Sequence, residues 1–106
     1  MTNAKAEFIK HTGDRLIKCA SIEGEKGFTI AKLDSDFDVK QLKAFLKAID
    51  FKYDSGYGGQ ELYGMIWYED GTWSHRGEYD GSEWWEHNEC PEIPDELKTN
   101  GRLEDV

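Results

Sequence analysis

The stretch from Gln60 to His87 reads QELYGMIWYEDGTWSHRGEYDGSEWWEH and contains two Asp-Gly pairs, Asp70-Gly71 and Asp80-Gly81. Runs of β-favouring residues flank each pair. An Asp-Gly pair between such runs is a strong hairpin signal, because a type I′ turn needs a positive φ at both central residues. We therefore predict a three-stranded meander with strands at about 61–69, 72–79 and 82–88.

Two-residue loops at both turns would fix the register of this meander. They place Glu69 opposite Thr72, and Arg76 opposite Trp85, with side chains alternating between two faces. The face expected to form the core carries Leu62, Gly64, Ile66, Tyr68, Trp73, His75, Gly77, Tyr79, Trp84 and Glu86, with Trp84 lying over the two glycines. The other face carries Tyr63, Met65, Trp67, Glu69, Thr72, Ser74, Arg76, Glu78, Glu83 and Trp85.

The second of these faces is the candidate binding surface, because it interleaves aromatic and acidic side chains. Tryptophan, tyrosine and arginine contribute most to the energies of protein interfaces. Alternatively, the helix or an N-terminal strand covers part of this face. The candidate partner-binding residues are Tyr63, Trp67, Arg76, Glu78, Glu83 and Trp85.

The first half of the chain predicts two more strands and one helix. Strands are expected at 15–23 and 28–33 around a loop at 24–27, while residues 1–6 are expected to be frayed and 7–10 to start or extend a strand. Asp38 and Gln41 have the spacing of a capping box. The apolar stripe that follows predicts a helix over about 39–50. Its members are Val39, Leu42, Phe45, Leu46 and Ile49.

The predicted element order is β-β-α-β-β-β. We expect a single α+β domain over residues 1–106, in which an antiparallel sheet of about five strands packs on one helix. Residues 94–98 suit one short helical turn that begins with proline. Residues 100–106 are expected to form a mobile acidic tail.

The charge of the chain, −9 overall, is unevenly distributed. Residues 1–59 hold ten Lys/Arg against nine Asp/Glu, whereas residues 60–106 hold three against thirteen. Such a field repels nucleic acid and attracts basic partners. No apolar run has the length of a membrane span, and no signal peptide is evident. We expect a cytoplasmic protein with Cys19 and Cys90 reduced.

Two groups of residues are candidate chemical sites. His87 and Cys90 have a His-x-x-Cys spacing, but this is half of a zinc site, which needs four ligands. His75, opposite Glu86 across the strands, is the alternative of an acid–base pair in a small pocket. Neither cysteine nor any serine has a nucleophile context. We expect no metal, no cofactor and no enzymatic activity.

Within Tyr53–Leu97, above all in IWYEDGTWSHRGEYDGSEWWEHNECPEIPDEL, the chain resembles small uncharacterised proteins of tailed bacteriophages. That group has no established activity to transfer. The resemblance implies a host bacterial cytoplasm and a role in host takeover or counter-defence. Several small acidic phage proteins present carboxylates in place of DNA phosphates, which the acidic second half would suit.

The leading hypothesis is a non-enzymatic protein that binds, and inhibits or redirects, a host protein with a basic surface, including a nucleic-acid-binding one. The second is a small-molecule binder or small enzyme with a pocket around His75 and Glu86. The third is a virion accessory protein. The sequence predicts no direct nucleic-acid binding and no membrane association.

Overall fold

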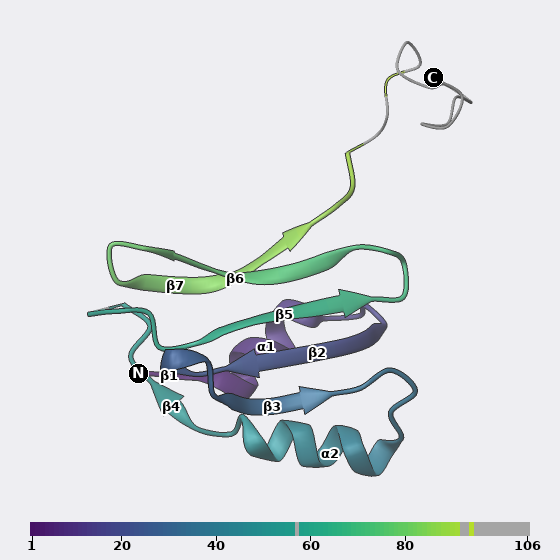
Figure 1. Cartoon of the computed structure of the whole chain (residues 1–106), viewed down its shortest axis with the longest axis horizontal. Coiled ribbons are helices and arrows are strands. Elements are labelled where there is room, and N and C mark those ends of the chain that lie inside the picture. Colours follow the sequence, from purple (N-terminus) through teal and green to yellow (C-terminus); the bar gives the residue numbers. More distant parts are fainter. Residues whose placement is uncertain (57, 92–93, 95–106) are drawn as a thin grey trace.

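A five-stranded antiparallel sheet forms the centre of the computed structural model, with strands in the order β3-β2-β5-β6-β7 (Figure 1). The structure describes residues 1–56, 58–91 and 94. The predicted α+β class and the C-terminal meander are confirmed. The strands are β2 (Ile17–Glu23), β3 (Thr29–Leu33), β5 (Tyr63–Tyr68), β6 (Trp73–Tyr79) and β7 (Ser82–Asn88).

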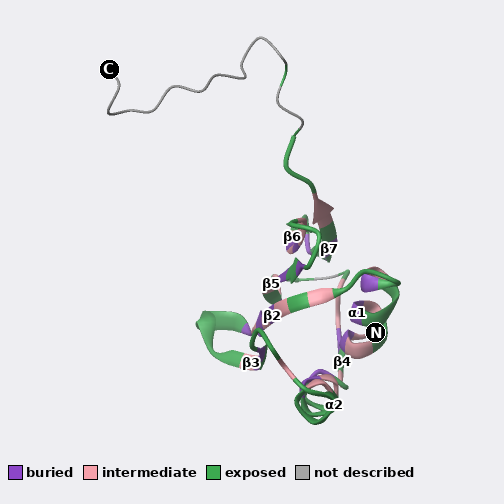
Figure 2. Ribbon diagram, turned by 90° about the vertical axis from the view of Figure 1, so that its right-hand side faces the viewer, coloured by how far each residue is buried: buried purple, intermediate pink, exposed green. Residues whose placement is uncertain are grey.

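Two helices, where one was predicted, and a two-stranded sheet lie on one side of the large sheet (Figure 2). The helices are α1 (Ala4–Thr12) and α2 (Val39–Ala48), and the short strands are β1 (Thr2–Asn3) and β4 (Lys52–Tyr53). A single 3-10 turn, η1 (Glu25–Gly27), lies in the predicted loop between β2 and β3. None of the helices in the described part of the chain is long and apolar enough to cross a bilayer.

The prediction for residues 1–10 was wrong, because these residues begin a helix. Asn3 caps α1 by accepting a hydrogen bond from the Ala6 amide at 2.9 Å, which satisfies one of the free N–H groups of the first turn. Pairing of β1 with β4 holds the residues before the helix in place. The predicted helical turn at 94–98 and the predicted tail at 100–106 lie outside the described residues, apart from Pro94.

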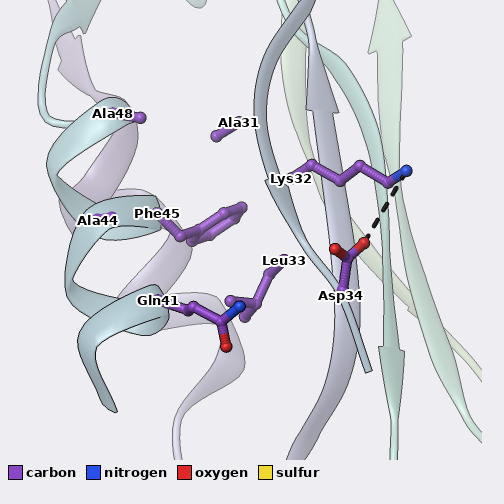
Figure 3. Close-up of a pocket in the computed structure, with 8 residues that line it drawn as sticks. All are labelled: Ala31, Lys32, Leu33, Asp34, Gln41, Ala44, Phe45 and Ala48. Atoms are coloured by element: carbon purple, nitrogen blue, oxygen red, sulfur yellow. Dashed lines mark ion pairs between the residues drawn. The ribbon is translucent and has the colours of Figure 1, made fainter. Parts of the chain in front are cut away.

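Helix α2 follows the sequence-based prediction at its start. Asp38 and Gln41 form the reciprocal capping box, and Phe45 points from the helix toward β3 (Figure 3). Phe45 and Ile49 are buried. Val39 departs from the predicted stripe, since it is 68% exposed, and the helix ends at Ala48 rather than near residue 50.

The predicted register was wrong at the first Asp-Gly turn and right at the second. The Tyr68 amide donates to the Thr72 carbonyl at 3.0 Å, so Glu69, Asp70 and Gly71 form a three-residue loop, with Gly71 at φ 86°. Such a loop is a type I turn followed by a left-handed residue. Ile66 therefore pairs with Ser74 instead of His75.

This one-residue difference exchanges the two faces of β6 and β7 relative to β5, because side chains alternate with a period of two. At the second turn, Asp80 (φ 51°) and Gly81 (φ 85°) form the predicted two-residue loop. The pairs Arg76–Trp85 and Gly77–Trp84 are confirmed. Arg76 and Trp85 consequently face the helices, whereas Trp84 faces the opposite side.

Pairing between β5 and β6 covers only three positions, while β6 and β7 pair over seven, and the two parts of the sheet diverge beyond the first turn (Figure 1). Trp84 does lie over Gly77, since a Cβ there would come within 2.9 Å of the indole. Gly64 does not lie under Trp84 but makes a close contact with β2. It has φ 156°, and a Cβ on it would lie 2.4 Å from the Ser21 carbonyl oxygen of β2.

The core lies between the large sheet and the two helices. Phe8 of α1 joins the two ends of this core, because its ring centroid is 5.2 Å from that of Phe45 and 6.0 Å from that of Trp85. The buried apolar residues are Ala4, Phe8, Ala20, Ile22, Ala31, Leu33, Phe45, Ile49, Tyr53, Leu62, Ile66, Tyr68 and Trp85.

Candidate functional site

The face of the sheet turned away from the helices carries a group of large side chains, which we call the outer aromatic face. Its members come from the three strands of the meander. Tyr63, Trp67 and Trp84 are 38–40% exposed, and Tyr79 is 77% exposed. The outer aromatic face comprises Tyr63, Met65, Trp67, Trp73, Tyr79 and Trp84.

Strand register brings these side chains together. Trp67 of β5 lies directly opposite Trp73 of β6, and Met65 lies opposite His75 in the next row. Side chains that face each other across strands have Cβ atoms about 5 Å apart. Trp67 and Trp73 therefore adjoin on this face, whereas Tyr79 and Trp84 lie on the part of β6 and β7 that has diverged from β5.

All the exposed fixed charges that residues 60–91 themselves carry are negative. Residues 60–91 contain eight Asp/Glu and one Lys/Arg. That one cation, Arg76, has a side chain that is 1% exposed and pairs with Glu83, which is 0% exposed. The acidic residues left at the surface of the meander are Glu61, Glu69, Asp70, Glu78, Asp80, Glu86 and Glu89.

The six predicted partner-binding residues do not share one surface. Tyr63 and Trp67 lie on the outer aromatic face. Glu78 is exposed, but it lies on the other side of β6, and its carboxylate accepts a hydrogen bond from the Gly81 amide at 3.0 Å. The other three are buried at 5–8% exposure. They are Arg76, Glu83 and Trp85.

Sequence reasoning also assigned three members of the outer aromatic face to the core. These are Trp73, Tyr79 and Trp84. The Glu-Asp-Gly sequence at residues 69–71 allows a two-residue or a three-residue loop, and only the three-residue loop places these side chains outward. No other signal in the meander distinguishes the two faces, since both are rich in aromatic residues.

The buried residues form a polar cluster around Arg76 on the helix side of the sheet. Its guanidinium donates to Glu7 of α1 at 3.0 Å, to the Tyr53 hydroxyl of β4 at 2.8 Å, and to Glu83 of β7 at 2.9 Å. Tyr53 also donates to Glu7. Burial, and then the hydrogen bond to Glu7, raise the pKa of Tyr53 above its usual value. Four elements are thereby joined by one cation.

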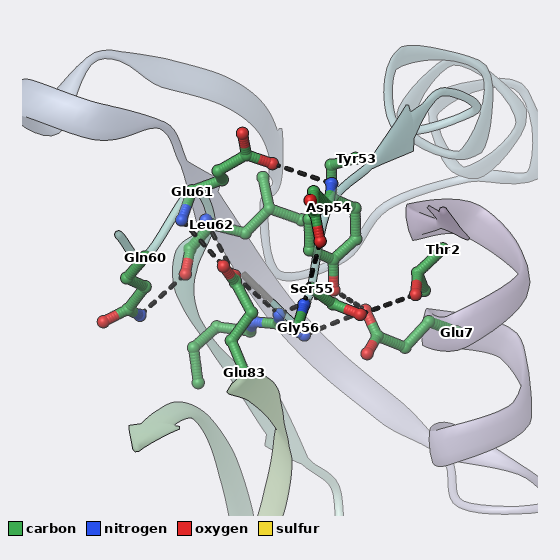
Figure 4. Close-up of polar contacts among 11 residues, drawn as sticks. Thr2, Glu7, Tyr53, Asp54, Ser55, Gly56, Gln60, Glu61, Leu62 and Glu83 are labelled. Atoms are coloured by element: carbon green, nitrogen blue, oxygen red, sulfur yellow. Dashed lines mark hydrogen bonds and ion pairs between the residues drawn. The ribbon is translucent and has the colours of Figure 1, made fainter. Parts of the chain in front are cut away.

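Glu83 also binds two backbone amides (Figure 4). Its carboxylate accepts the amide of Glu61 at 2.8 Å and the amide of Leu62 at 3.0 Å. These amides precede β5, where β5 and β6 have diverged, so the carboxylate takes the place of a backbone partner. The Arg76 Nε has no hydrogen-bond partner among the residues that the structure describes. Arg76 and Glu83 are closed to solvent, while the Glu7 side chain is 20% exposed, and the cluster joins the helix side to the sheet.

A second polar chain runs beside this cluster. His11 Nε2 lies 2.8 Å from Ser74 Oγ, which lies 2.7 Å from the Tyr68 hydroxyl. The His11 ring stacks on Trp85 with centroids 6.2 Å apart. Ser74 is 0% exposed, so no substrate reaches it as a nucleophile. Burial, then electrostatic interaction with Arg15, His87 and Arg76, lowers the pKa of His11.

This lowered pKa predicts that the protein loses stability as the pH falls through the histidine range. Neutral His11 is favoured in the folded chain, so its contribution is complete above the unfolded pKa and decreases as the unfolded chain becomes protonated. We expect the urea midpoint to fall between about pH 7.5 and 5.5 by more in the wild type than in a His11→Gln variant. Parallel midpoints for the two proteins would contradict this assignment.

The two candidate chemical sites lie on opposite faces of the meander. His75 and Glu86 face each other as predicted, at 3.6 Å, but on the outer face with 40% and 55% exposed side chains. Asn88 donates to His75 Nδ1. His87 Nε2 lies 2.9 Å from the Thr72 hydroxyl. Within the described residues, no three potential metal ligands are grouped.

Among the grooves of the described residues, two lie between a helix and the sheet. One, of about 240 Å³, runs between α2 and β3 (Figure 3). Gln41 is its main polar side chain on the helix, and that amide is occupied by the capping box. The other groove, of about 470 Å³, runs between α1 and the edge strand β7 and is lined by Glu7, Lys10, His11, Trp84 and Trp85.

Comparison with known proteins assigns no family to this chain. A scan against protein-family models found no matching model. Searches of the curated proteins and of the solved structures found no match either. The resemblance to phage proteins remains a prediction, and the function has to be argued from the site itself.

Proposed function

We propose that this protein is a non-enzymatic binding protein whose outer aromatic face docks on a basic surface of another protein. One observation carries the proposal. Exposed Tyr63, Trp67, Tyr79 and Trp84 occupy a part of the chain in which every described surface charge is negative.

The aromatic side chains would supply most of the affinity. Trp and Tyr are enriched among the residues that dominate interface energies, because each buries a large area at a small cost in side-chain entropy. Trp67 and Trp73 are held in place by their strands, so little further ordering is needed on binding.

The carboxylates would supply selectivity and speed of association. A surface of one sign steers an oppositely charged partner and repels others. Nucleic acid is disfavoured, because its phosphates would meet carboxylates where a nucleic-acid binder presents lysine and arginine. A basic protein surface, including one that itself binds nucleic acid, is the partner that fits.

The phage resemblance supplies a setting for this proposal. In a host bacterial cytoplasm, a small acidic protein that occupies a basic surface would inhibit or redirect the host protein. The negative charge of the meander supports binding to a basic surface. The Trp/Tyr patch favours one specific partner over a general substitute for DNA.

The test has two stages. The protein is used to capture partners from bacterial lysate, and the affinity of each purified partner is then measured with variants. We expect Trp67→Ala to weaken binding by about thirtyfold, which corresponds to a hot-spot residue. Val39→Ala is the matched control, because Val39 is an exposed apolar residue on α2, away from the outer aromatic face. Equal affinities for the two variants would refute the proposal.

A further inference from the structure

Strand β7 has an open edge. It is the last strand in the order of the sheet. The Glu83 amide points away from β6, since it donates to the Ser55 carbonyl at 2.8 Å. Backbone groups of alternate residues point to the same side of a strand. The N–H and C=O groups of Trp85 and His87 therefore also point toward this edge, whereas those of Trp84 and Glu86 point toward their partners in β6.

The chain itself shows that this edge accepts an extended segment. The Ser55 carbonyl accepts a hydrogen bond from the Glu83 amide, and Gly56 forms an antiparallel bridge with Ser82. This pairing covers only the start of β7. Among the described residues, no strand pairs with the edge from Trp85 to Asn88.

The groove of about 470 Å³ between α1 and β7 lies beside this edge. His11, Trp84 and Trp85 line it, with Glu7 and Lys10 of α1 at its polar side. A strand added to β7 would direct every second side chain to this side of the sheet. The groove therefore suits apolar side chains at alternate positions.

We propose that the partner contributes an extended segment that adds to β7 as a further strand, with apolar residues facing the groove and basic residues facing the outer side. This deepens the proposed function and rests on it for the sign of the charge. On the outer side, the added strand would lie next to Trp84 and Glu86. A lysine or arginine on the outer side of the added strand would contact the Trp84 indole and the Glu86 carboxylate.

Charge distinguishes this occupant from a second copy of the same chain. Two β7 edges paired with each other would bring Glu86 of one copy close to acidic residues of the other copy. Like charges that face each other across strands are destabilising. A basic segment meets complementary charge at the same positions.

The probe is a capped peptide of about eight residues that alternates valine and lysine, a usual strand length. Amide exchange is measured by NMR on the free protein and with the peptide. In the free protein, we expect fast exchange at Trp85 and His87 and slow exchange at Trp84 and Glu86. The peptide should slow the first pair at least about tenfold, as a new backbone hydrogen bond would.

A pair of variants tests the same backbone contact. His87→Pro removes the outward N–H and leaves the pairs with β6 intact, because proline is accepted where a strand edge faces solvent. His87→Ala removes the side chain and keeps the N–H. We expect His87→Pro to bind the peptide about tenfold more weakly than His87→Ala.

The outcomes separate this inference from the proposed function. Slow exchange at Trp85 and His87 in the free protein, no slowing by the peptide, or equal binding by the two His87 variants would each overturn strand addition. The exchange measurement uses the wild-type chain, so it decides the matter even when the proline variant fails to fold. Trp67 lies two strands from β7, and Trp67→Ala therefore tests the outer aromatic face alone.

Discussion

Replacement of Arg76 by methionine is expected to lower the free energy of unfolding by about 3–5 kcal/mol, the usual effect of removing one partner from a buried ion pair. Methionine fills a similar volume but leaves Glu83, which is 0% exposed, without its cation. Glu7 loses the same partner. Glu83 also accepts hydrogen bonds from the amides of Glu61 and Leu62. Displacement of its carboxylate would therefore weaken the segment that leads into β5.

Urea denaturation, followed by tryptophan fluorescence, measures this loss. The control is Glu86→Gln, which breaks the exposed pair with His75 and should cost less than about 1 kcal/mol. A triple variant, Glu7→Gln, Arg76→Met and Glu83→Gln, should regain part of the stability, because it removes the unpaired charges together with the cation. A loss below about 1 kcal/mol in Arg76→Met would show that solvent reaches the cluster.

Truncation of Phe8 to alanine is the second change with a large expected effect. Phe8 is 1% exposed and contacts both Phe45 and Trp85. Removal of its ring leaves a cavity where the two ends of the core meet, and the expected loss is about 3–5 kcal/mol. For a domain of this size, such a loss is a large part of the total stability.

The neighbouring residue supplies the control. Ile9 lies on the same helix but is 48% exposed, and Ile9→Ala should change the free energy of unfolding by about 0.5 kcal/mol or less. Thermal unfolding of both variants separates the two cases. Small and equal effects would mean that α1 contributes little to the fold.

Features set by neighbouring residues could be predicted from the sequence. The capping box of α2 needs only Asp38 and Gln41, and the turn at Asp80-Gly81 needs only two positive φ angles. Both are complete within one short segment. The α+β class follows from these elements and from the alternation of the strands.

Features set by distant residues could not be predicted. Helix α1 offers a weak pattern, since only Ala4, Phe8 and Thr12 are buried in it, and its partners lie in the meander. At the first Asp-Gly turn, the choice between loop lengths was not determined locally. It places Ser74 where it contacts Tyr68 and His11, and those contacts are visible only in the assembled fold.

The same choice of loop length determined which residues of the candidate site were predicted on the correct face. Tyr63 and Trp67 are exposed, because they belong to β5, which precedes the turn. Arg76, Glu83 and Trp85 follow the turn and were therefore assigned to the wrong side. A single error in loop length thus moved half of the predicted surface into the core.

The ion pair between Glu7 and Arg76 joins residues 69 positions apart, and this separation has a consequence during translation. The first helix emerges from the ribosome long before its counterparts have been synthesised. A nascent chain that ends before residue 76 leaves Phe8 without Trp85 and Glu7 without its cation. Closure of such a long loop is slow and comes late. Chains stalled at this stage would expose the apolar side of the amino-terminal helix to chaperones and proteases.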